Sequence, residues 1–169
     1  MDFASGAALV IASIACWTDL RTRRIPNVLT LCAAGAGVAF HAFVSGNGPL
    51  LALAGWLTGV LLFAPLFMLR GMGAGDLKLL AAFGAWLGPL MVLRIGLWSA
   101  VAGGGLAVAV ALMHGYLGRA LRNVWLLLTH WRATGIKPLD AVSLDKGTGP
   151  RLAYAVPLMV GLMVALWMR

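Results

Sequence analysis

Residues 50–69 form an unbroken stretch of twenty residues without a charged side chain, and other apolar stretches lie on both sides of it. A helix rises about 1.5 Å per residue, so a stretch of this length spans the roughly 30 Å hydrocarbon core of a bilayer. Helices satisfy all of their backbone hydrogen bonds within that core. The sequence therefore predicts an all-α fold, a polytopic membrane protein.

The composition agrees with this class, because 62% of the residues are hydrophobic and only 11% are charged. Soluble domains usually carry about 25% charged residues. The net charge of +8 is expected to come from cytoplasmic loops rather than from nucleic-acid binding. Cys16 and Cys32 are too few and wrongly spaced for a zinc site, so neither a metal nor another cofactor is expected.

We predict a single domain over residues 1–169, with about six transmembrane spans. Pro26 and Asn27 mark the start of the second span, with Asn27 as its N-cap, and Gly88 and Pro89 break the chain after the fourth. The fourth span is short, which indicates that its loop dips toward the membrane or that protein partly covers the helix. The predicted spans are residues 3–17, 28–44, 50–69, 77–87, 90–113 and 152–168.

A basic segment follows the fifth span. Residues 119–132 carry apolar side chains at near-helical spacing among arginines, which predicts an amphipathic helix on the membrane surface. A polar loop over 134–151 completes a long cytoplasmic loop, 114–151. Three consecutive glycines, 103–105, predict a weak point in the fifth span. The apolar positions of the basic segment are Leu121, Val124, Trp125, Leu128 and Trp131.

The distribution of positive charge predicts the orientation. If the N-terminus lies outside, eleven of the thirteen Lys and Arg residues fall within the loops at 18–27, 70–78 and 114–151. Basic residues collect in cytoplasmic loops. The same orientation puts Asp19 and Asp76 together on the cytoplasmic face.

The chain has five acidic residues, all of them aspartate. Asp2 is terminal, and Asp140 and Asp145 lie in the polar loop, where solvated carboxylates are expected. Asp19 and Asp76 each stand at the cytoplasmic end of a span. Two carboxylates brought close in a partly dry setting do not both ionise easily, so one keeps a proton while the other acts as a base. An aspartic protease needs this arrangement.

Residue types alone leave other interpretations open. Asp76 would also serve as the N-cap of the fourth span, with Asp19 paired to Arg21 or Arg23. A small transporter or channel would use both acids as a proton or cation relay, although relay acids are expected nearer the bilayer centre. A non-catalytic subunit of a secretion assembly would need them only as helix caps.

Two motifs carry a family resemblance. Gly73-Ala-Gly75-Asp76 is a Gly-x-Gly-Asp motif, and Asp19 begins the pattern Asp-Leu-Arg-Thr-Arg-Arg-Ile-Pro-Asn. Together with the six-span length they resemble the type IV prepilin peptidases, the GxGD-type membrane aspartic proteases of peptidase family A24. The resemblance covers essentially the whole chain. It implies that Asp19 and Asp76 are the catalytic pair, and that Gly73 and Gly75 let an extended substrate backbone lie against the loop.

The resemblance also implies partners and a location. The substrates would be type IV prepilin or pseudopilin precursors, whose short basic leader is cut at the cytoplasmic face of the bacterial inner membrane. Membrane lipid is a further partner and nucleic acid is not, while the oligomeric state stays open. The chain is most similar to the short forms of tight-adherence (Flp) pili, which lack the zinc-binding insertion. Peptidase activity without methyltransferase activity is therefore predicted.

Overall fold

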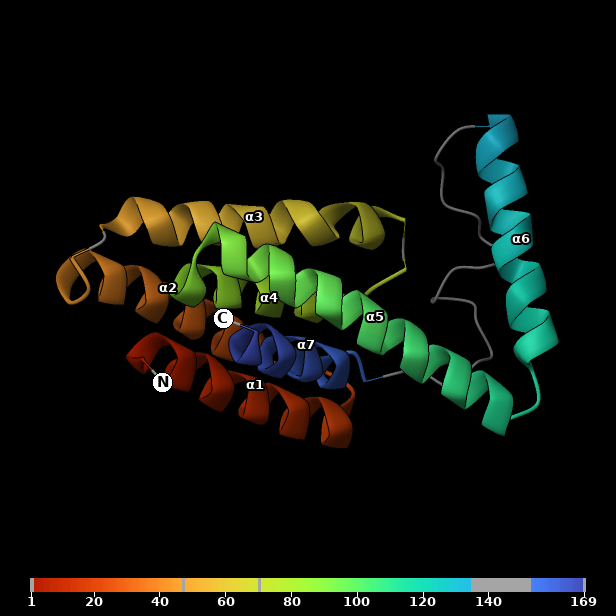
Figure 1. Ribbon diagram of the computed structural model, residues 1–169, viewed down its shortest axis with the longest axis horizontal. Helices are drawn as coiled ribbons and strands as arrows, with labels where there is room; N and C mark the ends of the chain where they lie inside the picture. The colour runs from red at the N-terminus through yellow and green to blue at the C-terminus, as the bar shows by residue number, and fades with distance from the viewer. Residues whose placement is uncertain (1, 47, 70, 135–152, 169) are drawn as a thin grey trace.

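The computed structural model describes residues 2–46, 48–69, 71–134 and 153–168. This part of the chain folds entirely into helices and their connections, without a strand, so the all-α prediction is confirmed (Figure 1). The helices are α1 (Phe3–Thr22), α2 (Asn27–Phe43), α3 (Pro49–Met68), α4 (Ala74–Leu87), α5 (Pro89–Met113), α6 (Leu117–Thr134) and α7 (Ala155–Trp167).

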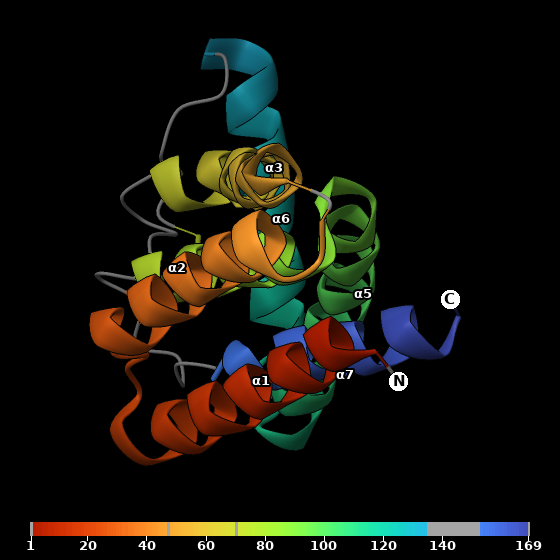
Figure 2. The same ribbon diagram turned by 90° about the vertical axis from the view of Figure 1, so that its left-hand side faces the viewer.

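Helix α4 forms the centre of the bundle. Residues 79–86 are all buried, and α4 contacts α1, α2, α3, α5 and α7. Figures 1 and 2 show the longer helices around it. A helix that is apolar on every side is stable only where other segments surround it. Protein therefore covers the short fourth apolar segment, one of the two arrangements that its length predicts.

Small residues let α4 approach its neighbours closely. Gly55 of α3 and Gly84 of α4 face each other, and a Cβ atom added at either would overlap the carbonyl of the other. A Cβ at Gly59 would lie 2.7 Å from the Cα of Ala81. Small residues at facing positions are typical of helices that pack within membranes, where backbone proximity provides the van der Waals contact.

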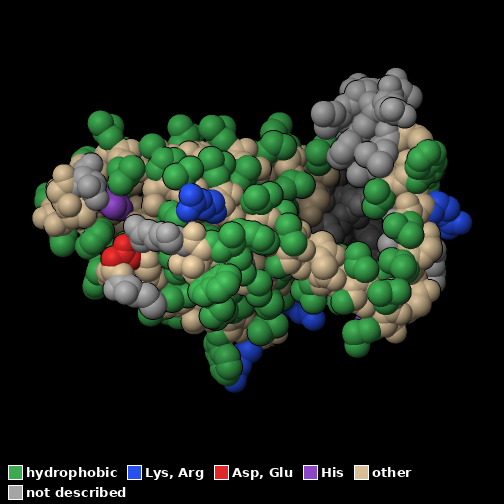
Figure 3. All heavy atoms as spheres, viewed as in Figure 1, with side chains coloured by type: hydrophobic (Ala, Val, Ile, Leu, Met, Phe, Trp, Pro, Cys, Tyr) green, Lys and Arg blue, Asp and Glu red, His purple; other side chains and the backbone are tan. Residues whose placement is uncertain are grey.

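The outer surface of the bundle is apolar. Leucine, valine and tryptophan side chains are exposed along α1, α3 and α5, and Figure 3 shows apolar side chains over most of the face it presents. These three helices are long and apolar enough to cross a bilayer, while α2 and α7 are shorter apolar helices. An apolar exterior of this extent is typical of a membrane protein. The fold is that of a polytopic membrane protein, and the count of six spans remains a prediction.

Helices α1 and α2 differ in their boundaries from the sequence prediction. The first helix continues to Thr22 rather than ending near residue 17, and Arg23 closes it in the left-handed conformation with φ 55°. Asn27 is the first residue of α2, and Pro26 occupies the N-cap position without a side-chain cap. The prediction of Asn27 as N-cap is therefore wrong. The Asn27 side chain instead binds a lysine of α4, described below.

Other boundaries follow the sequence more closely. Gly88, with φ 82°, separates α4 from α5, as the Gly-Pro pair predicts. Helix α5 runs without interruption through glycines 103–105, so the expected weak point leaves no break in the helix. The predicted basic helix is present as α6. Residues 135–152, which contain Asp140 and Asp145, lie outside the described residues.

Helix α1 begins and helix α7 ends at the same end of the bundle in both ribbon views (Figures 1 and 2). Helix α1 runs away from that end, and α4 begins at the opposite end after the chain has passed along α3. The last turn of α1 and the first turn of α4 are therefore neighbours, and each carries one of the two candidate aspartates.

Candidate active site

Asp19 lies in the last turns of α1 and is only 7% exposed. Its Oδ2 accepts a hydrogen bond of 3.2 Å from the backbone N–H of Ala155, the first residue of α7. The N-terminus of a helix carries partial positive charge, so a carboxylate oxygen is a favourable hydrogen-bond acceptor there. The start of α7, 136 residues later in the chain, therefore holds the Asp19 side chain in place.

Asp76 is the third residue of α4 and is partly buried. The N-cap position belongs to Gly73, and the Asp76 carboxylate accepts a hydrogen bond from the Gly73 backbone N–H. An acid at this position that reaches back to the N-cap N–H satisfies one of the unpaired donors of the first turn. Asp76 thus helps to cap α4, although it does not stand at the N-cap itself.

The two carboxylates are close enough to interact electrostatically. Burial, followed by the negative charge of Asp19, raises the pKa of Asp76 to about 7, and the hydrogen bond from Gly73 partly opposes this shift. Asp76 precedes the apolar stretch of α4, which begins at Leu77. Near neutral pH the pair therefore holds a proton on Asp76 in a substantial fraction of molecules.

The two sequence motifs that contain these acids also contact each other. A Cβ atom added at Gly75 would lie 3.1 Å from the Cβ of Ile25, so the glycine permits close packing of the two motifs. Lys78 Nζ donates a hydrogen bond of 2.9 Å to Asn27 Oδ1. This hydrogen bond joins α4 to α2. These contacts hold the start of α4 against the α1–α2 connection.

Gly73 and Gly75 are needed for space rather than for unusual backbone angles. Neither has a positive φ. A Cβ atom added at Gly73 would lie 3.1 Å from Asp76 Oδ2, and one at Gly75 would press on Ile25. A glycine can be required for a positive φ or for close approach of other atoms, and close approach applies here.

Tyr154, which the sequence analysis did not select, also lies at this site. It occupies the N-cap position of α7, directly before the residue that binds Asp19, and it interacts electrostatically with Asp76. Its ring packs edge-on against Phe63, with ring centroids 6.2 Å apart. Tyr154 belongs to neither motif, so the two motifs do not identify it.

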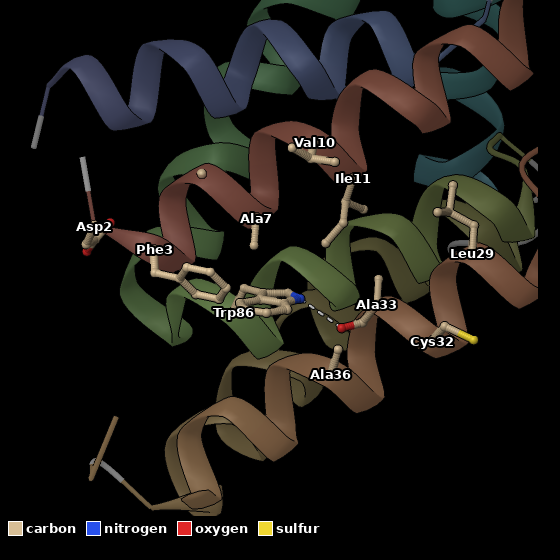
Figure 4. A pocket seen from close by; sticks show the side chains of 11 residues that line it. Asp2, Phe3, Ala7, Val10, Ile11, Leu29, Cys32, Ala33, Ala36 and Trp86 are labelled. Carbon is tan, nitrogen blue, oxygen red and sulfur yellow. Dashed lines mark hydrogen bonds between the residues drawn. The ribbon is translucent and has the colours of Figure 1, made fainter. Parts of the chain in front are cut away.

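A separate apolar groove lies between α1 and α2, nearer the end that holds the termini (Figure 4). Its volume is about 680 Å³, and Trp86 of α4 forms part of its wall. The Trp86 Nε1–H donates a 2.8 Å hydrogen bond to the Ala33 carbonyl, which fixes the indole in place. Neither Asp19 nor Asp76 lines the groove, so the carboxylate pair does not open into it.

Fold and site together define a polytopic helical membrane protein with two interacting carboxylates at one end of its bundle. The chain belongs to the Type IV leader peptidase family, whose family model matches residues 7–108. This range includes Asp19, Asp76 and both motifs, and it ends before Tyr154. The membership confirms the resemblance drawn from the two motifs.

Several curated relatives are named prepilin leader peptidase/N-methyltransferase. The protein of Burkholderia pseudomallei (strain K96243) is 37% identical over 108 residues, which cover 60% of this chain and 34% of the relative. That of Aeromonas hydrophila is 36% identical over 124 residues, or 63% of this chain and 43% of the relative. The Legionella pneumophila protein is 37% identical over 109 residues, 56% of this chain and 38% of the relative. The chain thus spans well under half the length of these relatives. No solved structure matches the chain.

Proposed function

We propose that this chain is a membrane aspartic endopeptidase that removes the short basic leader from type IV prepilin-like precursors. The observation that carries the proposal is the electrostatic pairing of Asp19 with Asp76, which leaves one carboxyl protonated near neutral pH. Family membership and the names of the relatives support the same chemistry.

The surroundings of the two acids suggest a role for each. Asp19, beside the N-terminus of α7, would be the ionised base, and Asp76, with its raised pKa, would be the acid. Asp19 takes a proton from water as the water oxygen bonds to the scissile carbonyl carbon, and Asp76 gives its proton to the carbonyl oxygen. When the C–N bond breaks, the leaving nitrogen takes the proton held by Asp19, and the hydroxyl proton returns to Asp76.

The loop before α4 offers an exposed strip of backbone for the substrate. Gly73 and Ala74 are exposed and lie next to Asp76. An extended peptide that meets a glycine backbone forms main-chain contacts without interference from side chains. Gly73 would therefore align the cleavage site of the precursor beside the two carboxylates, and Gly75 would support it by letting the start of α4 pack against Ile25.

The active end of the bundle would face the cytoplasm of a bacterial inner membrane. The loops 18–27, 70–78 and 114–151 contain eleven of the thirteen Lys and Arg residues, and the first two of these loops carry Asp19 and Asp76, which favours a cytoplasmic position for the aspartates. Asp19 and Asp76 at one end of the bundle, rather than midway along it, also disfavour a proton or cation relay. Peptidase activity without methyl transfer remains a prediction for this chain.

Leader removal from a pilin-like precursor by the full chain in membranes tests the proposal. Asp19→Asn and Asp76→Asn are each expected to lower the cleavage rate at least about a thousandfold, because each removes one member of a cooperating pair. Asp2→Asn is the matched control, since Asp2 caps α1 at the opposite end and Asn is an equally good N-cap. Full processing by either of the first two variants would remove that residue from the mechanism. Absence of processing by the unaltered chain would refute the peptidase proposal.

A further inference from the structure

Tyr154 and the residue that follows it interact with both carboxylates of the site. The backbone N–H that follows it, that of Ala155, donates to Asp19 at 3.2 Å. Its own side chain interacts with the charge of Asp76. One short segment at the start of α7 therefore reaches both acids, which come from α1 and α4.

The Tyr154 ring is held by two other helices. A Cβ atom added at Gly103 of α5 would lie 3.0 Å from Tyr154 Cε2 and 3.1 Å from its hydroxyl oxygen. Phe63 of α3, only 2% exposed, meets the ring edge-on at an interplanar angle of 74°. This packing leaves the ring little freedom to turn. Among the glycines of the 103–105 run, only Gly103 has an atom within 4 Å of its added Cβ.

Among the residues that the structure describes, the charges around Asp76 come from few elements. Asp19 faces it from α1 and Tyr154 from the start of α7, while Lys78 on its own helix binds Asn27. A phenol ordinarily titrates at about pH 10, so the Tyr154 hydroxyl stays protonated in the neutral range. Tyr154 therefore adds a bulky ring within electrostatic range of Asp76 without adding charge.

We propose that Tyr154 is a positioning residue of the carboxylate pair: its ring, held by Gly103 and Phe63, fixes the start of α7 against Asp19 and keeps water away from Asp76. The expected effect of Tyr154 on the cleavage rate rests on the proposed peptidase function. Its expected effect on the surroundings of Asp76 does not, and it can be measured without cleavage.

The kinetic test compares Tyr154→Ala with Tyr154→Phe in the full chain reconstituted with a pilin-like precursor. Removal of the ring is expected to lower kcat roughly tenfold to a hundredfold with little change in KM, because the acids lose their alignment. Phe keeps the ring, so Tyr154→Phe should retain kcat within about threefold. In Tyr154→Ala, water should reach Asp76 and favour its ionised form. The pH above which the cleavage rate falls should therefore be about one unit lower in this variant, and it should be unchanged in Tyr154→Phe.

A matched pair of glycine variants tests the same contact from the other side. Gly103→Ala presses on the Tyr154 ring and is expected to lower kcat several-fold, while Gly104→Ala, whose Cβ meets open space, should leave it unchanged. Equal effects of the two variants would contradict the role assigned to the ring contact.

A spectroscopic titration separates this inference from the proposed function. The Asp76 carboxyl carbon is followed by NMR in detergent-solubilised chain labelled with ¹³C-aspartate and is assigned through Asp76→Asn. Its midpoint should fall by about one pH unit in Tyr154→Ala and stay in place in Tyr154→Phe. An unchanged midpoint in Tyr154→Ala would overturn the inference, whether or not the chain cleaves a precursor. A shifted midpoint in a chain that cleaves nothing would support it and would refute only the peptidase proposal.

Discussion

Helices α4 and α6 lie in opposite surroundings. Helix α4 has 14 residues and is enclosed by five other helices, and its first turn carries Asp76. Helix α6 has 18 residues and, among the described elements, contacts only α5. Figure 1 shows α6 running across the direction of the bundle helices. Helix α4 is the shorter of the two but the more deeply buried. The length of a helix therefore does not decide how much the fold depends on it.

The difference follows from how apolar side chains are distributed around each helix. The apolar residues of α4 lie on all sides and are buried against protein. In α6, Leu121, Val124 and Trp125 are exposed, and polar or basic residues occupy other faces. A helix of the second kind suits a boundary between apolar and aqueous phases. Substitutions in α4 should therefore affect folding and catalysis, whereas substitutions in α6 should affect membrane contact.

Apart from the two aspartate variants, the largest effect is expected where α4 meets α3. Gly84→Ala places a methyl group against the carbonyl of Gly55, so the two helices must separate. Such overpacking typically costs about 1–3 kcal/mol of unfolding free energy. Gly104→Ala is the control, because its methyl meets open space on α5 and alanine favours the helix by up to about 1 kcal/mol. Thermal unfolding in detergent measures both. An unchanged midpoint for Gly84→Ala would show that α3 and α4 are not closely packed.

Local sequence patterns predict much of this arrangement. Apolar segments define the helices, and the pair Gly88-Pro89 marks the boundary between α4 and α5. The motifs around Asp19 and Asp76 identify the two acids as candidates. Local patterns do not predict the bond between Lys78 and Asn27, 51 residues apart, because it depends on how α2 and α4 pack.

Tyr154 illustrates the same limit. It lies in no motif, and its role depends on Gly103 and Phe63, which belong to other helices. The N-cap prediction for Asn27 was wrong because its side-chain oxygen accepts from Lys78, while Pro26 takes the capping position. Helix propensity describes the isolated segment, and tertiary contacts decide which partner a polar side chain receives.

The pH dependence of cleavage is the next largest expected effect. The mechanism requires a proton on Asp76, whose pKa is raised to about 7. Below this value the acid form predominates, and above it the rate should fall up to about tenfold per pH unit. Cleavage of a precursor in detergent between pH 6 and 9 measures this limb. A rate that keeps rising through pH 8 would contradict the assignment of Asp76 as the acid.

A smaller effect is expected from the contact that holds the start of α4. Lys78→Met keeps the aliphatic stem but removes the donor to Asn27, an exposed hydrogen bond worth about 0.5–1.5 kcal/mol at most. We expect cleavage to slow about two- to fivefold, because the first turn of α4 carries Asp76. Asn27→Ala should have a similar effect, and the double variant should add little to either single change. Full additivity of the two effects would show that the residues act independently.

The smallest effect on cleavage is expected in α6, which we propose lies in the interface of the cytoplasmic leaflet. Trp125→Leu keeps an apolar side chain on the exposed face and should change the cleavage rate less than about twofold, because α6 contacts neither aspartate. Its position is measured directly by fluorescent labels on Leu121→Cys and Asn123→Cys, in a chain whose exposed Cys32 is replaced by alanine. In vesicles containing anionic lipid, brominated acyl chains should quench the label at 121 and aqueous iodide the label at 123. Equal quenching of both labels by iodide would mean that α6 is surrounded by water. Helices α4 and α6 would then differ in burial, and α6 would have no contact with the membrane.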